Sequence, residues 1–155
     1  MGSGSEVDQT NQYEKLLELF GATTIMVIGL MALIIAILVI VAMWRIFKKA
    51  GEPGWKAIIP IYNSYILFKI VWDTKFFWIS FGLGLLSSIV NVLPAIGWLS
   101  YLISIATFII EVMVLNRLSK SFGHGTGFTI GLLFLPFIFF MILGFGSDEF
   151  SPVNE

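Results

Sequence analysis

The chain has 155 residues, of which 57% are hydrophobic and 12% charged, and its formal net charge is −1. A soluble domain carries about 25% charged residues, so this chain has too little polar surface to cover a water-soluble globule. Disorder is excluded as well, because it requires low hydrophobicity and high net charge. The composition therefore indicates a protein of the lipid bilayer. The absence of cysteine excludes disulfide frameworks, thiolate metal sites and cysteine nucleophiles.

The N-terminal part of the chain, residues 1–20, is polar and acidic. It opens with MGSGS at residues 1–5, which is typical of a flexible linker or an expression remnant. The helical spacing of Tyr13, Leu16, Leu17 and Phe20 predicts a short amphipathic helix ahead of the first span.

The first membrane span is predicted at residues 21–44. Residues 25–44 carry no charge, and at 1.5 Å per residue they cover about 30 Å, the thickness of a bilayer core. A signal peptide has a shorter apolar region that follows basic residues, whereas this stretch follows acidic ones. The pattern therefore favours a membrane span.

The segment from residue 50 to residue 75 is the least regular part of the chain. Gly51, Pro53 and Gly54 are expected to end the first helix. The apolar piece that follows covers only about 20 Å as a helix and contains Asn63 and Lys69. We therefore expect an interfacial or re-entrant amphipathic helix at about residues 58–72.

Three further spans are predicted at residues 76–96, 97–116 and 127–145. The last contains Pro136, which neighbouring helices are expected to accommodate. The predicted fold is therefore all-α: an integral membrane four-helix bundle with one additional interfacial segment. It forms a single transmembrane domain over residues 21–146, followed by a tail at residues 147–155.

The distribution of charge predicts the orientation, because Lys and Arg gather on the cytoplasmic side of a membrane protein. With four spans, the basic residues predicted on that side are Arg45, Lys48, Lys49, Lys56, Lys69, Lys75, Arg117 and Lys120. Lys15 lies on the other side with the acidic residues Glu6, Asp8, Glu14, Glu18, Asp148, Glu149 and Glu155. We therefore expect a protein of the cytoplasmic membrane with both termini outside the cell.

Small and polar residues recur on single helix faces, a pattern typical of helix contacts in membranes. The residues of these stripes are Ser80, Gly84 and Ser88 in the second span, Ser100, Ser104, Thr107 and Glu111 in the third, and Gly127 and Gly131 in the fourth. They are either packing contacts inside the bundle or the lining of a polar path.

Glu111 is the one charged residue inside a predicted span, about 9 Å along the helix from Arg117. Such carboxylates usually face the bundle interior or a cavity. Glu111 therefore has either a structural role or a functional one, in which it serves as a proton site or a ligand site. His124 lies between glycines and is interpreted as a solvated loop residue.

The segment KAGEPGWKAIIPIYNSYILFK, at residues 49–69, resembles the signature of DUF5684, a family of uncharacterised prokaryotic multi-pass membrane proteins. A short FGxxxGF loop before the last span matches as well, and the resemblance covers roughly residues 25–146. The matching residues are Ala50, Gly51, Pro53, Gly54, Trp55, Pro60, Tyr62, Asn63, Tyr65, Phe122, Gly123, Gly127 and Phe128. Some members are fused to signal peptidases, which implies an anchoring or accessory role. The first motif is predicted on the cytoplasmic face, either as an architectural elbow or as a docking groove for a lipid or a partner helix.

No constellation for catalysis is present, because the sequence lacks His-Glu-x-x-His, Gly-x-Ser-x-Gly and paired carboxylates in one span. We expect no catalytic residue, metal, cofactor or nucleic-acid partner. The expected function is a non-enzymatic membrane scaffold or accessory subunit that binds lipid and either another membrane protein or further copies of itself. The alternative is a small transporter or channel subunit whose polar path is lined by Glu111 and the serine stripe.

Overall fold

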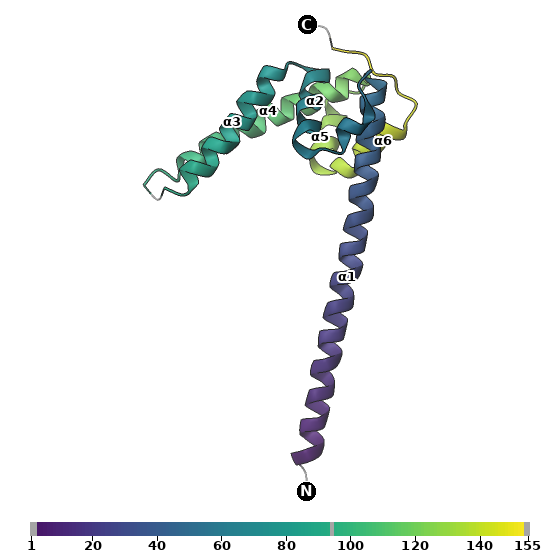
Figure 1. Ribbon diagram of the computed structural model, residues 1–155, viewed down its shortest axis with the longest axis vertical. Helices are drawn as coiled ribbons and strands as arrows, with labels where there is room; N and C mark the ends of the chain where they lie inside the picture. The colour runs from purple at the N-terminus through teal and green to yellow at the C-terminus, as the bar shows by residue number, and fades with distance from the viewer. Residues whose placement is uncertain (1–2, 94, 154–155) are drawn as a thin grey trace. The chain divides into compact units, whose positions relative to one another are not determined.

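The computed structural model describes residues 3–93 and 95–153, with side chains from residue 11 onward. Its regular elements are all helical: α1 (Ser3–Lys49), the 3-10 turn η1 (Gly54–Ala57), α2 (Pro60–Val71), α3 (Thr74–Asn91), α4 (Leu99–Ser121), α5 (Thr126–Phe134) and α6 (Pro136–Phe145) (Figure 1). The all-α prediction is confirmed. Met1 and Gly2 of the expected linker, and Glu155 of the acidic tail, lie outside the described residues, whereas Ser3 to Ser5 belong to α1.

The chain divides into two units, one up to Ile37 and one from Leu38 onward, and each is described by itself. In the first unit, α1 is uninterrupted, so the expected short helix ahead of the first span is not a separate element. Every side chain from residue 11 to residue 37 is exposed, including Ile25 at 72% and Met26 at 74%. From residue 25 to residue 37 these exposed residues carry no charge, and exposed apolar surfaces of this kind are characteristic of interaction sites.

Two helices are long and apolar enough to cross a membrane. They are α1, over Asn11–Lys49, and α4, over Leu99–Ser121. Helix α6 is also apolar but shorter. Residues 58–72, where an interfacial helix was expected, contain the helix α2. Pro60 occupies its first turn, where the missing N–H of proline costs no hydrogen bond.

The core of the second unit lies where the last turns of α1 meet the shorter helices. Helix α1 buries Ala42, Met43, Ile46 and Phe47, whose spacing places them on one helix face. Helices α2, α4, α5 and α6 each contribute one fully buried hydrophobic side chain, namely Ile66, Leu118, Leu132 and Leu143.

Helices α3 and α4 pack side by side and are joined by the turn that precedes α4 (Figure 1). The less exposed residues alternate at spacings of three and four, which is the pattern of knobs-into-holes packing. These residues are Ser80, Leu83, Ser87 and Val90 in α3 and Ser100, Ile103, Thr107 and Ile110 in α4.

The predicted fourth span is not one helix, and its prediction at residues 127–145 is wrong in this respect. Helix α5 ends at Leu135, whose φ of −132° and ψ of 55° are not helical, and α6 begins at Pro136. A residue before proline is driven out of the helical region by the proline ring. The ring of Phe139 lies against Gly131 and 4.7 Å from the ring of Phe128, so α6 folds back on α5. At nine and ten residues, each helix covers about 15 Å, half of a bilayer core.

Helix α6 approaches α1 closely at Gly144. A Cβ placed there would lie 2.7 Å from the Cα and carbonyl oxygen of Ala42. Two small residues therefore allow the backbones to touch, as is common between helices that pack without large side chains.

The substitution Gly144→Ala tests this contact. The added methyl group forces α6 away from α1, and we expect the free energy of unfolding to fall by about 1–3 kcal/mol. Thermal unfolding followed by circular dichroism in detergent measures the change. The matched control is Gly127→Ala, because nothing lies within 4 Å of a Cβ at Gly127. Equal stabilities of the two variants would contradict the close approach.

Candidate functional site

The elbow after α1 is built by the glycines of the family motif. Gly51 has a φ of +79°, and the N–H of Glu52 donates to the carbonyl of Phe47 while the N–H of Gly51 donates to that of Lys48. These two bonds form a Schellman motif, which requires a left-handed residue such as glycine. Gly54 then lies directly under the indole of Trp44, where a Cβ would collide with the ring.

The aromatic residues of the motif form a ladder that joins η1, α2 and α3. The ring centroids are 6.1 Å apart for Trp55 and Tyr62, 5.8 Å for Tyr62 and Tyr65, and 5.4 Å for Tyr65 and Phe77. Asn63 ties the ladder to η1, since its side-chain amide donates to the carbonyl of Ala57 at 3.1 Å. The aromatic residues of the first motif are therefore brought together beside the elbow.

One carboxylate holds the elbow electrostatically. Glu52 accepts hydrogen bonds from the ammonium groups of Lys56 at 2.6 Å and Lys69 at 2.7 Å, and its side chain is only 15% exposed. The hydrogen bond from Lys56, followed by that from Lys69, lowers the pKa of Glu52 below its ordinary value. The same contact raises the pKa of Lys56.

A second polar site lies on the outer surface of the α3–α4 pair. Gly84 and Ser87 of α3 and Ser104, Thr107, Phe108 and Glu111 of α4 line a hollow of about 330 Å³. Glu111 also borders a smaller hollow of about 190 Å³ toward Ser64 and Phe68 of α2. We call this feature, lined by these residues, the Glu111 groove.

Only some residues of the predicted stripes lie on the packing faces of the helices. Gly84, Ser88 and Ser104 are exposed, whereas Ser100 is buried and Ser80 and Thr107 are partly buried. The hydroxyls of Ser88, Ser104 and Thr107 donate to carbonyls of their own helices, and that of Ser100 donates to the carbonyl of Gly97 just before α4. Ser87, which lies outside the predicted stripes, lines the groove in place of Ser88.

The Gly127–Gly131 pair does not join two spans. Gly127 is exposed, with open space around it. Gly131 accommodates the ring of Phe139 from α6, so it serves the fold-back within the predicted fourth span.

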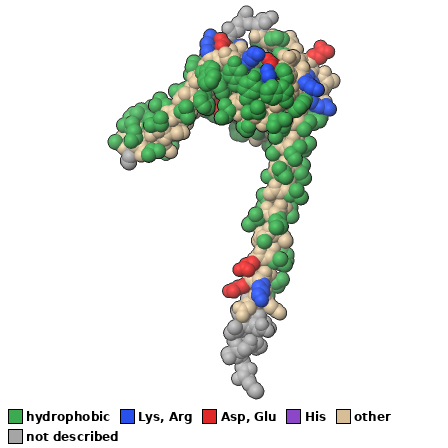
Figure 2. All heavy atoms as spheres, viewed as in Figure 1, with side chains coloured by type: hydrophobic (Ala, Val, Ile, Leu, Met, Phe, Trp, Pro, Cys, Tyr) green, Lys and Arg blue, Asp and Glu red, His purple; other side chains and the backbone are tan. Residues whose placement is uncertain are grey.

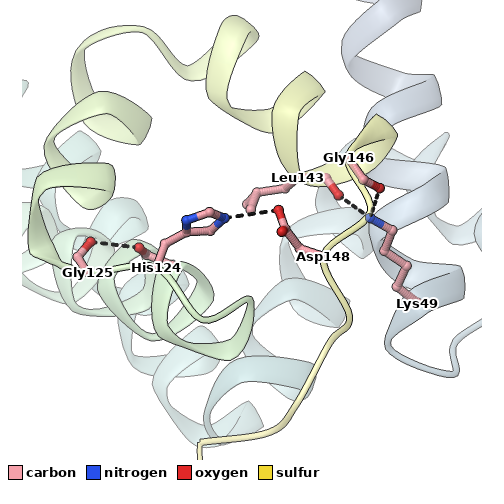
Figure 3. Close-up of polar contacts among 7 residues, drawn as sticks. Lys49, His124, Gly125, Leu143, Gly146 and Asp148 are labelled. Carbon is pink, nitrogen blue, oxygen red and sulfur yellow. Dashed lines mark hydrogen bonds and ion pairs between the residues drawn. The ribbon is translucent and has the colours of Figure 1, made fainter.

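A set of polar contacts at the end of α6 was missed from the sequence. The ammonium of Lys49 donates to the carbonyls of Leu143 at 2.6 Å and Gly146 at 2.9 Å, and the imidazole Nε2 of His124 lies 3.0 Å from Asp148 Oδ2 (Figure 3). We call these five residues the clasp. Beside it, the N–H of Ser151 donates to the carbonyl of Ser121.

The clasp contradicts the predicted distribution of charged residues between the two sides of the membrane. Asp148 was expected across the membrane from Lys49 and His124, but the structure brings all three to one end of the second unit. The physical reason is the break at Leu135 and Pro136, since α6 returns toward α1 and carries the tail with it. His124 is thus a paired residue that stacks on Phe128 at 4.1 Å, not a solvated one. In the sequence, Pro136 is the residue that could have indicated this return of the chain.

Removing the Lys49 ammonium tests the clasp. In Lys49→Met the carbonyls of Leu143 and Gly146 lose their charged donor, which is worth about 1–3 kcal/mol. We expect amide hydrogens of residues 146–151 to exchange about tenfold faster in hydrogen-exchange mass spectrometry. Lys48→Met is the matched control, because Lys48 is exposed on the same turn. An identical exchange rate in both variants would show that Lys49 does not hold the tail.

The lowered pKa of Glu52 predicts a pH dependence of stability. A carboxyl whose folded-state pKa is depressed stabilises the fold above its unfolded pKa, near 4.5, and this contribution is lost as the pH falls through the folded value. Glu52→Gln should lose about 1 kcal/mol at neutral pH and show less further loss on acidification than the unchanged protein. Thermal unfolding across this pH range is the measurement. Glu149→Gln, at an exposed position, serves as the control and should retain the full pH dependence.

Among the described residues, no group of three or more His, Asp or Glu side chains could hold a metal ion. No curated protein and no solved structure matches the chain. A family match covers residues 55–151, from Trp55 through the tail. It begins later than the resemblance expected from about residue 25, and it leaves α1 outside. Because the match spans more than half of its length, the chain belongs to DUF5684, a family of unknown function.

Proposed function

We propose that the chain is an integral membrane protein in which α1, α3 and α4 cross the bilayer. The α3 helix has 18 residues and is about 27 Å long. Because it packs along α4, α3 crosses the bilayer wherever α4 does. The pair α5–α6 enters the bilayer from the charged end and returns to it. In this arrangement the N-terminus and the C-terminal segment lie on opposite sides.

The distribution of charged side chains supports this arrangement. Salt bridges, the clasp and the contact of Arg117 with Trp72 gather the charges of the second unit at one end, as the blue and red side chains in Figure 2 illustrate. Because Lys and Arg mark the cytoplasmic side, this end is the cytoplasmic face of the proposed orientation, in the cytoplasmic membrane.

The proposed function is that of a non-enzymatic scaffold or accessory subunit, which receives a helix of another membrane protein in the Glu111 groove. The observation that carries it is the position of Glu111. This residue is exposed and, among the described residues, its carboxyl group makes no hydrogen bond or ion pair. It lies about 9 Å along α4 from Arg117, well inside the proposed membrane. Carboxylates at such depth are costly unless a partner compensates them.

Two of the hydroxyl groups in the walls of the groove cannot donate to Glu111, and Ser87 is the remaining hydroxyl of the hollow between α3 and α4. The single hydroxyl hydrogens of Ser104 and Thr107 are already donated to carbonyls within α4. The exposed Gly84 allows another helix backbone to approach closely. A span with a Lys, Arg, amide or hydroxyl side chain opposite Glu111 satisfies both the shape and the charge of the groove.

A different membrane protein fits the groove better than a second copy of this chain. In a two-fold dimer the same patch faces itself, so two Glu111 carboxylates would meet. Like charges at close range in a low dielectric repel strongly. We therefore favour a heterologous partner over self-association.

A transporter or channel subunit is the second candidate. It is favoured by the position of Glu111 between two adjacent hollows, one toward α3 and one toward α2. Together they form a polar line from Ser64 past Glu111 to Ser104. Ion flux in proteoliposomes that disappears in Glu111→Gln would support this function over the accessory one.

Site-specific cross-linking tests the accessory function. The chain contains no cysteine, so Ser104→Cys and Ile105→Cys each carry one thiol for a photoreactive maleimide. Ser104 lines the groove, whereas Ile105 points about 100° away around α4 and is 56% exposed. In native membranes we expect a discrete adduct from position 104 and little from position 105, measured by mass spectrometry.

The partner's dependence on Glu111 is the second readout. Adding Glu111→Leu to Ser104→Cys should abolish the adduct, while Glu111→Gln, which keeps hydrogen-bonding capacity, should retain part of it. Circular dichroism establishes that each variant is folded. An adduct at twice the mass of the chain would contradict a heterologous partner, and equal adducts from both positions would contradict the groove as its site.

A further inference from the structure

A third hollow lies between α4 and α5, on a different face of α4 from the Glu111 groove. It has a volume of about 440 Å³, and its walls include Val112 and Met113 from α4 and Ile130 and Leu133 from α5. The walls are mostly apolar, and the volume lies within the range of sites for single small ligands.

The two ends of this hollow differ in polarity. Arg117 and Lys120 line it toward the charged end of α4. The guanidinium carbon of Arg117 lies 4.7 Å from the ring centroid of Trp72, a cation–π contact that holds the side chain in place. Lys120 is exposed and, within the described part of the chain, makes no ion pair. The hollow thus has a cationic end and an apolar end.

The wall between these ends is fixed by a buried hydrogen bond. The side-chain amide of Asn116 donates to the hydroxyl of Thr129 at 3.1 Å, and Thr129 is only 4% exposed. Both residues line the hollow, so this bond joins α4 to α5 within its wall.

We propose that this hollow binds one anionic phospholipid, with its phosphate group at Lys120 and an acyl chain along Val112, Ile130 and Leu133. Two features of the hollow support this ligand. Its cationic end complements the charge of a phosphate group, and its apolar end suits an acyl chain. A phospholipid has an anionic head followed by an apolar chain, and basic pockets between membrane helices on the cytoplasmic side suit such head groups. The proposal rests on the membrane placement given above, which puts Lys120 at the level of the head groups.

A soluble anion does not use the rest of the cavity. Inorganic phosphate has no group to cover the apolar side chains of α5, whereas burial of an acyl chain contributes about 0.8 kcal/mol for each CH₂ group in general. The experiment therefore includes free phosphate as a separate arm.

Native mass spectrometry of the full chain released from detergent micelles tests the proposal. The protein is equilibrated with equal amounts of phosphatidylglycerol and phosphatidylcholine, and the bound fraction of each is compared. We expect one phosphatidylglycerol to be retained preferentially. In Lys120→Gln its retention should fall about fivefold, the loss expected for one charge near an anionic lipid surface.

Two further variants separate the hollow from general electrostatics. Lys48→Gln removes the same charge from an exposed position at the same end of the unit and should leave retention unchanged. Ile130→Trp fills the apolar half from a position that is 56% exposed, so the fold tolerates it, and it should lower the retention of both lipids. Circular dichroism and size-exclusion chromatography verify that each variant is folded.

The possible outcomes separate this proposal from the proposed function. Equal loss in Lys120→Gln and Lys48→Gln, no effect of Ile130→Trp, or displacement of the lipid by inorganic phosphate alone would overturn the lipid site. In those cases the adduct formed by Ser104→Cys, and its dependence on Glu111, remain a separate test of the accessory function. If the protein leaves the membrane fraction in a carbonate wash, both proposals fail together.

Discussion

Because Pro136 has no backbone N–H and its ring excludes Leu135 from the helical conformation, the last apolar stretch of the chain cannot run straight. The rest of the second unit depends on this constraint. Helix α6 turns back, its terminal carbonyls meet the ammonium of Lys49, and the tail reaches His124. This local restriction on the backbone, together with the contacts that receive α6, determines on which side of the unit the C-terminal segment lies.

The polar groups of the second unit fall into two kinds with different consequences. At the charged end, several carboxylates are paired with cations, as in the bridge of Glu52 to two lysines, and these pairs stabilise the fold. Glu111 lies apart from them and is unpaired among the described residues. In the proposed membrane position, Glu111 costs free energy without stabilising its own chain, and ionisable residues of this kind are typical of functional sites.

Local signals in the sequence predicted local structure well. Gly51 ends α1 and Pro60 opens α2, because the conformations of these residues are restricted by their own covalent structure. The stripes at a spacing of four identified the correct helices, yet the contact between α3 and α4 includes Ser87 and excludes Ser88. That shift arises because packed helices alternate spacings of three and four, and the choice of partner face is a tertiary effect.

The clasp could not be predicted by counting charges. The sequence shows Pro136, but whether a proline bends a span slightly or reverses it depends on what receives the returning helix. Here Ala42 offers a flat surface for Gly144, and Gly131 leaves space for the ring of Phe139. These contacts join residues that are far apart in the chain, and they decide the position of Asp148.

Helix α1 is subject to two different kinds of constraint along one uninterrupted backbone. From residue 11 to residue 37 its side chains are exposed, so one apolar residue can replace another there as long as length and hydrophobicity are kept. Beyond that point Ala42, Ile46 and Phe47 are enclosed, and shape decides which substitutions are accepted. Homologous chains should therefore vary widely in the first part of this helix and very little in its last three turns.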